Sequence, residues 1–233
     1  MRSREDDYIA RLMPTLLLIR HAQASYGGPD YDVVSDRGRQ QLDVLNRALH
    51  RRGIVPARIL TGSMRRQQET ARACARPAGP EVTVDTRWNE YSDDDVLSHH
   101  STSSQRLDGS GAISSRDFQV IIDAALKSWI TAGDGGSHET WPQFRGRVTE
   151  ALNDAVRDLG RGESALAFSS SGVIAALVAA LLGLPDVAFL AFNRVSVNTG
   201  ITKVILGSRG MTLVSYNEHG HLEEAGAGLV TYR

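Results

Sequence analysis

An unbroken apolar run, TLLLI at residues 15–19, constrains the fold of this chain more than any other feature. A strand with one solvated face alternates apolar and polar residues, whereas a strand buried on both faces is apolar throughout. Burial on both faces is typical of a parallel sheet that carries helices on its two sides. The run stops at Arg20 and His21, so polar side chains follow the C-terminal end of this strand.

Strand and helix patterns alternate along the rest of the chain. Residues 35–53 have a Ser-Asp start, leucines spaced for one helix face and a glycine stop, which together predict a helix. Further strands are predicted at RILTG (58–62), VTVDTRW (82–88), ALAFSS (165–170), ITKVILG (201–207) and MTLVSYN (211–217), the last two as a hairpin. This alternation predicts an α/β fold: a doubly wound, mostly parallel sheet flanked by helices on both faces, with ligands at the strand C-termini.

Length and composition predict one domain. With 233 residues, 41% of them hydrophobic, the chain can bury a sizeable core. We assign residues 1–13 to an N-terminal extension and 14–233 to a single domain. Residues 91–117 are rich in Ser, Asp and Gly without periodicity, which predicts an exposed polar insertion, and we expect it to cover the ligand pocket. Apolar stripes with helical spacing resume at 118–130 and 141–159.

Charge and cysteine content argue against several classes of protein. The balance of 26 Lys+Arg against 27 Asp+Glu leaves a net charge of -1, without the basic footprint of a nucleic-acid-binding protein. No apolar run approaches the ~18 residues of a membrane span, and the N-terminus lacks the apolar region of a secretory signal. The single cysteine, Cys74, cannot form an internal disulfide. We expect a cytoplasmic protein without cofactor, nucleic-acid partner or membrane partner; the oligomeric state does not follow from the sequence, and a homodimer stays open.

Three predicted strand ends carry groups that suit a phosphoryl ligand. Arg20-His21, the turn from Gly62 to Arg66, and the corner Ser169 to Gly172 converge on one edge of such a sheet. An arginine fork matches phosphate oxygens in a bidentate manner, and the first N–H groups of a helix are unpaired donors. These strand ends therefore predict a local site for a phosphoryl group, which inorganic phosphate or sulfate would also occupy.

Several motifs resemble the histidine phosphatase superfamily, the phosphoglycerate-mutase-like proteins. They are, in chain order, LLLIRHAQAS, SDRGRQQL, GSMRRQQETA, WNEY, HETWPQFRGRV and SYNEHGHLE. The resemblance covers most of the chain from residue 14 onward and implies a phosphoglycerate-mutase-like fold. It implies Arg20 and Arg66 as phosphate-binding residues, His21 as the nucleophile and Glu90 as the acid.

The chain departs from the family pattern at one pocket position. Where most members read Ser-His-Gly-Gly-Val-Ile, this sequence reads Ser169-Ser170-Ser171-Gly172-Val173-Ile174, so Ser170 replaces the second pocket histidine. A branch of the family has Ser or Thr there, and this chain resembles that branch. We expect Ser170 and Ser171 to bind phosphate. We also expect the corner Ser169 to Ser171 to cap the helix that follows, and the N–H groups near Ser171 to Val173 to point at the anion.

The chemistry that the resemblance implies is a phosphohistidine mechanism. His21 would attack phosphorus through a neutral ring nitrogen, kept neutral by Arg20 and Arg66, and water would then release the phosphoryl group. Glu90 would protonate the leaving oxygen, with its pKa raised by burial against Trp88 and Tyr91. We expect a histidine acid phosphatase-like enzyme that hydrolyses phosphomonoesters slowly, because one oxyanion donor typically contributes only ~3 kcal/mol of the roughly 8 to 23 kcal/mol by which enzymes lower barriers.

Alternatives remain open for the residues and for the function. The acid could be Asp93, Asp94 or Asp95, although Glu90 matches the family position. His219 could replace the missing imidazole, whereas His221 matches the closing motif of the family. We interpret His99 and His100 as solvated, not as metal ligands, and expect no metal site. For the substrate, we expect a small phosphorylated metabolite, with a phosphoprotein as the alternative. A phosphoglycerate mutase-type phosphotransferase and a phosphate-binding module with little turnover are the alternative functions.

Overall fold

The central element of the fold is a six-stranded sheet with the order β3-β2-β4-β1-β5-β6. A computed structural model describes residues 13–25, 32–100, 115–226 and 228–232. The strands are β1 (Thr15–Arg20), β2 (Arg58–Thr61), β3 (Val82–Val84), β4 (Ser164–Ser169), β5 (Ile201–Gly207) and β6 (Gly210–Glu218). Strands β1 to β4 run parallel, whereas β5 is antiparallel to β1 and forms a hairpin with β6. The predicted α/β class, mostly parallel sheet and C-terminal hairpin are confirmed.

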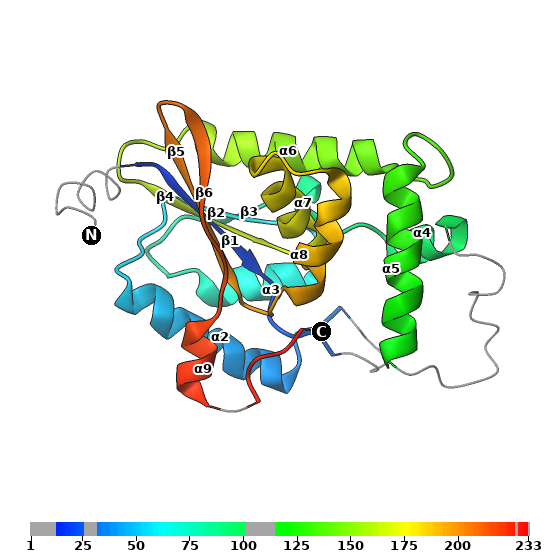
Figure 1. Ribbon diagram of the computed structural model, residues 1–233. Coiled ribbons are helices and arrows are strands. Elements are labelled where there is room, and N and C mark those ends of the chain that lie inside the picture. Colours follow the sequence, from blue (N-terminus) through cyan, green and yellow to red (C-terminus); the bar gives the residue numbers. More distant parts are fainter. Residues whose placement is uncertain (1–12, 26–31, 101–114, 227, 233) are drawn as a thin grey trace, which may run out of the picture.

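Helices cover both faces of the sheet (Figure 1). The helices are α2 (Asp36–Arg51), α3 (Arg65–Cys74), α4 (Asp93–His100), α5 (Ser115–Thr131), α6 (Trp141–Arg157), α7 (Ser171–Leu181), α8 (Phe189–Val195) and α9 (Gly220–Ala225), with short 3-10 turns η1 (Thr86–Trp88) and η2 (Asp186–Ala188). Helices α2, α3 and α9 lie on one side of the sheet, α6, α7 and α8 lie on the other, and α4 and α5 stand beside this core.

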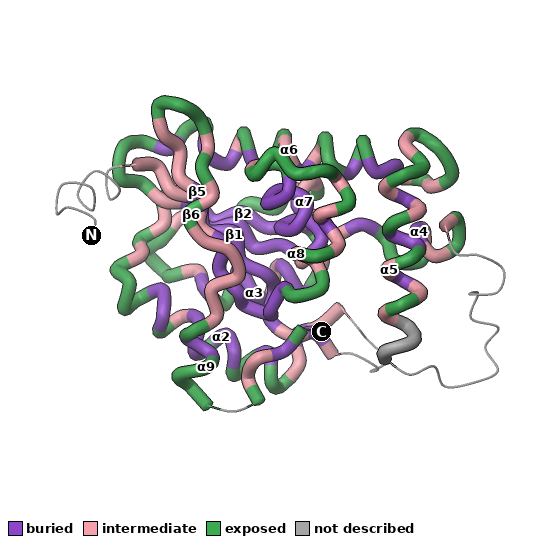
Figure 2. The backbone as a smooth tube through the Cα atoms, viewed as in Figure 1, coloured by how far each residue is buried: buried purple, intermediate pink, exposed green. Residues whose placement is uncertain are grey.

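Alternate residues of β1 enter two different hydrophobic clusters, as both-face burial requires. Leu16 and Leu18 pack in the cluster that includes the apolar residues of α5, α6 and α7. Leu17 and Ile19 pack in the cluster with α2 and α3. All four are at most 3% exposed, and Figure 2 shows a buried centre in which β1, β2 and α7 take part. The interpretation of residues 15–19 as a strand covered on both sides is confirmed.

Two helix starts follow directly from the sequence. The Ser35 hydroxyl accepts a hydrogen bond from the Gly38 N–H and caps α2. At α6, Thr140 and Gln143 form a capping box in which each side chain accepts from the backbone N–H of the other. Because such caps satisfy N–H groups that the first turn leaves unpaired, they fix where these helices begin.

Sequence analysis predicted no helix within residues 91–117, but residues 93–100 form α4. The Ser92 hydroxyl accepts from the Asp95 N–H at the start of this helix, and the three aspartates of its first turn complement the helix dipole. Val96 is only 1% exposed and anchors the helix to the core. Residues 101–114 lie outside the described part of the chain, so covering of the pocket by this segment stays a prediction. Residues 1–12 of the N-terminal extension also lie outside the described part of the chain, so their assignment as an extension stays a prediction.

The strand predicted over residues 82–88 is shorter in the structure. Strand β3 ends at Val84, and the Asp85 carboxylate accepts a hydrogen bond from the Arg87 N–H at the start of η1. An aspartate that bonds to its own following backbone offers the chain an alternative to the sheet ladder, and so ends the strand. Because β3 ends early, Trp88, Asn89 and Glu90 lie beyond its C-terminal end.

Within the described residues, no helix has the length and apolar character needed to cross a membrane.

Candidate active site

The C-terminal ends of β1 and β4 bring the first candidate residues together. Arg20 pairs in register with Ser169, and the His21 N–H donates to the Ser169 carbonyl at 2.8 Å. Parallel neighbouring strands end at the same edge, so the Arg20-His21 pair and the serine corner lie side by side. The expected convergence of these two strand ends is present in the structure.

In this geometry, one nitrogen of the His21 ring carries a proton and the other has a lone pair. Its Nδ1 lies 2.7 Å from the Ala22 carbonyl oxygen, and a carbonyl can only accept, so Nδ1 carries the proton. Its Nε2 accepts from the Arg66 Nε–H at 3.2 Å. Burial, together with the positive charges of Arg66 and Arg20, holds the pKa of His21 well below its ordinary value. The imidazole is therefore neutral near pH 7, with Nε2 directed at the guanidinium.

Arg66 comes from the first turn of α3 and is 8% exposed. Besides its contact with His21, its Nη1 donates to the Asp32 carboxylate at 2.6 Å. The same carboxylate accepts from the Arg65 N–H at 2.7 Å, at the N-terminus of α3. Asp32 was missed in the sequence, because no local spacing connects it with a helix that begins more than thirty residues later. The Asp32 carboxylate therefore competes with any anionic ligand for the Arg66 guanidinium group.

Arg20 is held by main-chain carbonyl groups of the C-terminal part of the chain. Its Nη1 donates to the Ser196 carbonyl and, at 2.9 Å, to the Tyr232 carbonyl. The side chain is 7% exposed, and its charge lowers the pKa of both His21 and Glu90. Arg20 therefore lies in the cluster and supplies positive charge there, while part of its guanidinium anchors the chain end.

Glu90 lies in the segment after η1, near enough to Arg20 and Arg66 for their charges to affect its pKa. Its Oε2 accepts from the Gly172 N–H at 2.8 Å, in the first turn of α7. Burial raises the pKa of Glu90 to about 7, Asp93 adds to the rise, and the Gly172 hydrogen bond and both arginines oppose it. Trp88 and Tyr91, the expected sources of this burial, are 1% and 7% exposed.

The structure distinguishes Glu90 from the neighbouring aspartates. Asp93 and Asp94 are exposed in the first turn of α4. Asp95 accepts from the His138 and Glu139 N–H groups, in the loop before α6. Of these four carboxyl groups, only Glu90 has a described contact with the helix start of α7.

The three serines of the corner have different surroundings. The Ser169 hydroxyl donates to the Trp88 carbonyl at 2.6 Å. Ser170 is at the N-cap position of α7, but its side chain makes no capping hydrogen bond, so the expectation of a side-chain cap is wrong. Its hydroxyl accepts from the Gln67 Nε2 at 2.8 Å, and the residue is 1% exposed. Ser171 begins α7 and is half-buried.

Glu90 also changes the expectation for the first N–H groups of α7. They were expected to point at an anion, and the Gly172 N–H is occupied by the Glu90 carboxylate. A helix N-terminus favours negative charge, so this partner fulfils the electrostatic role that an anionic ligand was expected to have there.

Gln67 and Asn198 are further residues of the cluster that sequence analysis missed. The Gln67 Nε2 donates to the Trp88 carbonyl as well as to Ser170, and the residue is 0% exposed. Since the carbonyl can only accept, the amide nitrogen faces Ser170, and the serine hydroxyl keeps its own proton for a second acceptor. The Asn198 Nδ2 donates to the His21 carbonyl at 3.0 Å. Gln67 lies within the motif GSMRRQQETA, to which sequence analysis gave no role beyond Arg66, and Asn198 lies in none of the quoted motifs.

The two histidines near the chain end do not substitute for the missing imidazole in the described contacts. His219 lies next to the Asn217 carbonyl and Glu223. His221 is 4% exposed and contacts the Thr199 hydroxyl through Nε2 at 3.3 Å. Thr199 in turn donates its N–H to the Arg20 carbonyl. Through Thr199, His221 thus helps to hold the backbone at Arg20.

Comparisons with known proteins identify the family of this chain and similar folds. The family model described as histidine phosphatase superfamily (branch 1) matches residues 16–219. No curated protein matches the chain. Among solved structures, Bacillus stearothermophilus YhfR is 19% identical, with 89% of this chain and 98% of that chain covered and a TM-score of 0.65.

Two phosphatases whose names state a substrate have the same fold, at a similar sequence identity and TM-score. A mycobacterial glucosyl-3-phosphoglycerate phosphatase is 22% identical, with coverage of 87% and 98% and a TM-score of 0.61. A mutant phosphoserine phosphatase from Entamoeba histolytica, in complex with phosphoserine, is 18% identical, with coverage of 90% and 100% and a TM-score of 0.62. Because the family model matches most of the chain, from β1 to the end of the hairpin, the chain belongs to the histidine phosphatase superfamily.

Proposed function

We propose that this protein hydrolyses phosphomonoesters of small metabolites through a phosphohistidine intermediate on His21. The single observation that carries the proposal is the contact between the His21 Nε2 and the Arg66 Nε–H at 3.2 Å. This contact supports the proposal, because a neutral imidazole nitrogen can act as a nucleophile and a guanidinium group can bind phosphoryl oxygens bidentately.

The first step transfers the phosphoryl group to His21. The Nε2 lone pair attacks phosphorus, the bond between phosphorus and the ester oxygen breaks, and that oxygen leaves with the bonding electrons. Glu90, whose pKa is raised to about 7, donates its proton to the leaving oxygen, so that an alcohol departs. Arg66 and Arg20 stabilise the negative charge on the transferring group.

The second step hydrolyses the intermediate. Glu90, now ionised, takes a proton from a water molecule as the water oxygen attacks phosphorus, and the N–P bond breaks. Inorganic phosphate leaves, His21 regains its lone pair, and Glu90 is protonated again for the next cycle. All atoms and protons are supplied by substrate, water and these two side chains.

Ser170 makes the proposed enzyme slow. The family pattern has an imidazole at this position, and one preorganised donor to a developing oxyanion is typically worth about 3 kcal/mol. The Ser170 hydroxyl, which accepts from Gln67, retains a proton that it can donate to a phosphoryl oxygen. A rate reduced by up to about 10²-fold is therefore compatible with continued turnover.

The proposal is tested by following three products from one set of substrates. Purified protein is incubated with alkyl, aryl and sugar phosphates and with a phosphoglycerate, and released phosphate, isomerised phosphoglycerate and bound phosphate are measured. We expect release of phosphate to exceed isomerisation. Isomerisation equal to hydrolysis would show a mutase, and binding of phosphate without any release would show a binding module.

A more local expectation concerns the contact between Glu90 and α7. In Gly172→Ala, the added Cβ would lie 2.3 Å from the Glu90 Oε1 and 2.5 Å from the Tyr91 Cε1, so the carboxyl group must move. Because general acid catalysis contributes about 10²-fold to 10⁴-fold, we expect kcat/KM for alkyl phosphates to fall by about 10²-fold.

Gly146→Ala is the matched control for this substitution. Gly146 is exposed on α6, where an added Cβ meets no other part of the described molecule within 4 Å. This variant should keep full activity and gain about 0.5–1 kcal/mol in the free energy of unfolding. Equal kcat/KM values for the two variants would show that the position of Glu90 does not matter for turnover.

A further inference from the structure

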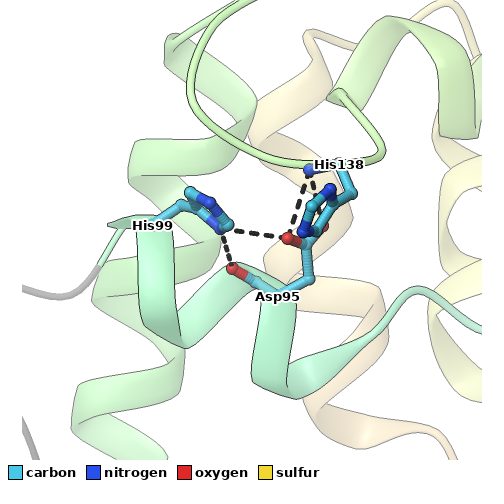
Figure 3. Close-up of side chains that lie close together, drawn as sticks. All are labelled: Asp95, His99 and His138. Atoms are coloured by element: carbon cyan, nitrogen blue, oxygen red, sulfur yellow. Dashed lines mark hydrogen bonds and ion pairs between the residues drawn. The ribbon is translucent and has the colours of Figure 1, made fainter.

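Two histidines and one aspartate, none of them part of the proposed active site, lie close together (Figure 3). Asp95 and His99 come from successive turns of α4, and His138 comes from the loop that precedes α6. Sequence analysis considered His99 together with His100 and favoured a solvated pair. The structure instead brings His138 to this helix from about forty positions along the chain.

The three side chains offer ligand atoms that lie within 4.8 Å of one another. The His99 Nδ1 and the Asp95 Oδ1 are 3.0 Å apart. In a tetrahedral zinc site with bonds of about 2.0–2.2 Å, ligand atoms are separated by roughly 3.3–3.6 Å. The distance between the His99 and Asp95 ligand atoms is therefore already close to that of a metal site. Rotation of the exposed histidine side chains can shorten the distances between the other pairs of ligand atoms.

Asp95 is held in place by the loop that carries His138. Its carboxylate accepts from the His138 N–H at 3.1 Å and 3.0 Å and from the Glu139 N–H at 3.3 Å. Hydrogen bonds of this kind orient a metal-ligating carboxylate and are a regular feature of metal sites. The backbone thus fixes the distance between α4 and the loop independently of the histidine rings.

An ion pair alone explains only part of this arrangement. Asp95 and His99 are four residues apart on a helix, where an acid and a histidine pair without any ligand. The His138 ring, however, lies with its centroid 5.5 Å from that of His99, at an interplanar angle of 83°. Two imidazoles beside one carboxylate form the donor set that binds Zn²⁺ and related divalent transition metals.

We propose that Asp95, His99 and His138 bind a divalent transition-metal ion, with Zn²⁺ as the reference ion. Both histidines are exposed, so water can occupy the remaining coordination position. The ion would connect α4 to the loop before α6. Because α4 begins three residues after Glu90, the site would also restrain the segment from which the proposed acid extends.

The test is zinc titration of the full chain, prepared without an affinity tag and freed of metal by a chelator. Isothermal titration calorimetry is carried out on the wild type, on His99→Ala, on His138→Ala and on the control His50→Ala. His50 is an exposed histidine in the last turn of α2, away from the cluster. We expect one zinc ion per wild-type chain, at least about 10-fold weaker binding for either cluster variant, and unchanged binding for the control.

Two further readouts make the outcome specific. Zinc should raise the thermal unfolding midpoint of the wild type and of His50→Ala, because an ion that binds the folded state stabilises it, but not that of the cluster variants. Cobalt(II) should give the visible absorption of a low-symmetry site only where both histidines are present. Absence of binding by the wild type, or unchanged binding in either His99→Ala or His138→Ala, would overturn the three-ligand site.

Discussion

His21→Ala should lower kcat for phosphate release by at least about 10³-fold. In an enzyme with a covalent intermediate, removal of the nucleophile eliminates the path, and losses of up to about 10⁶-fold are typical. The Arg66 guanidinium and the serine corner remain in this variant, so binding of inorganic phosphate should persist. The measurement is steady-state release of phosphate from the best substrate of the panel, together with phosphate binding by calorimetry.

The matched control for this prediction is His50→Ala, which removes an exposed imidazole from α2. Its kcat should equal that of the wild type. Thermal unfolding followed by circular dichroism establishes that His21→Ala is folded, since His21 is buried and its loss also removes packing. A folded His21→Ala protein with the kcat of the control would show that catalysis does not pass through this residue.

Glu90→Gln should lower kcat/KM by about 10²-fold to 10⁴-fold and remove a limb from the pH profile. The carboxyl group acts as an acid in the first step, so its protonated form is the active one. Its pKa is raised to about 7, which keeps that form populated below pH 7 and depletes it about tenfold for each pH unit above. The wild-type kcat/KM should therefore fall with increasing pH above about 7.

The low-pH side of the same profile has a different origin. The pKa of His21 is held well below 6.5 by burial and by Arg66 and Arg20, so the nucleophile stays neutral throughout the range in which Glu90 titrates. Protonation of His21 accordingly should not limit kcat/KM between pH 6.5 and the Glu90 limb. A decrease in activity as the pH falls from 7.5 to 6.5 would contradict both assignments.

Comparison of substrates makes the Glu90 experiment sharper. An alkyl phosphate expels a basic alkoxide that needs a proton, whereas an aryl phosphate with an acidic phenol needs little help. Glu90→Gln should thus impair the alkyl substrate much more than the aryl substrate. Asp94→Asn, which changes an exposed carboxylate of α4, is the control and should affect neither. Equal losses on both substrates would indicate that Glu90 has only a structural role.

The sheet and the principal cationic groups could be predicted because their signals are local. The TLLLI run showed that β1 is covered on both faces, and parallel strand ends placed Arg20 and His21 beside the serine corner. The turn from Gly62 to Arg66 was a third such strand end, and the motif resemblance selected Arg66 within it and added Glu90. These inferences depend only on patterns within a few residues of each other or on the order of motifs along the chain.

The remaining features of the site depend on contacts between distant segments. Nothing near Asp32 in the sequence indicates that its carboxylate binds the Arg66 guanidinium. The occupation of the Gly172 N–H by Glu90 likewise follows from tertiary packing, since a helix start is satisfied by whichever anion the fold supplies. The composition of residues 91–117 concealed α4 because its helix signals are acidic residues and one buried valine.

The most direct test of the account is to trap the intermediate on His21. Protein mixed with excess substrate is quenched within the first turnover in alkaline denaturant, which preserves N–P bonds, and the digest is analysed by mass spectrometry. The account predicts one phosphoryl group on the peptide containing His21, localised to that residue and absent from His21→Ala. Turnover without any phosphorylated His21, under conditions in which hydrolysis of the intermediate limits the rate, would contradict it.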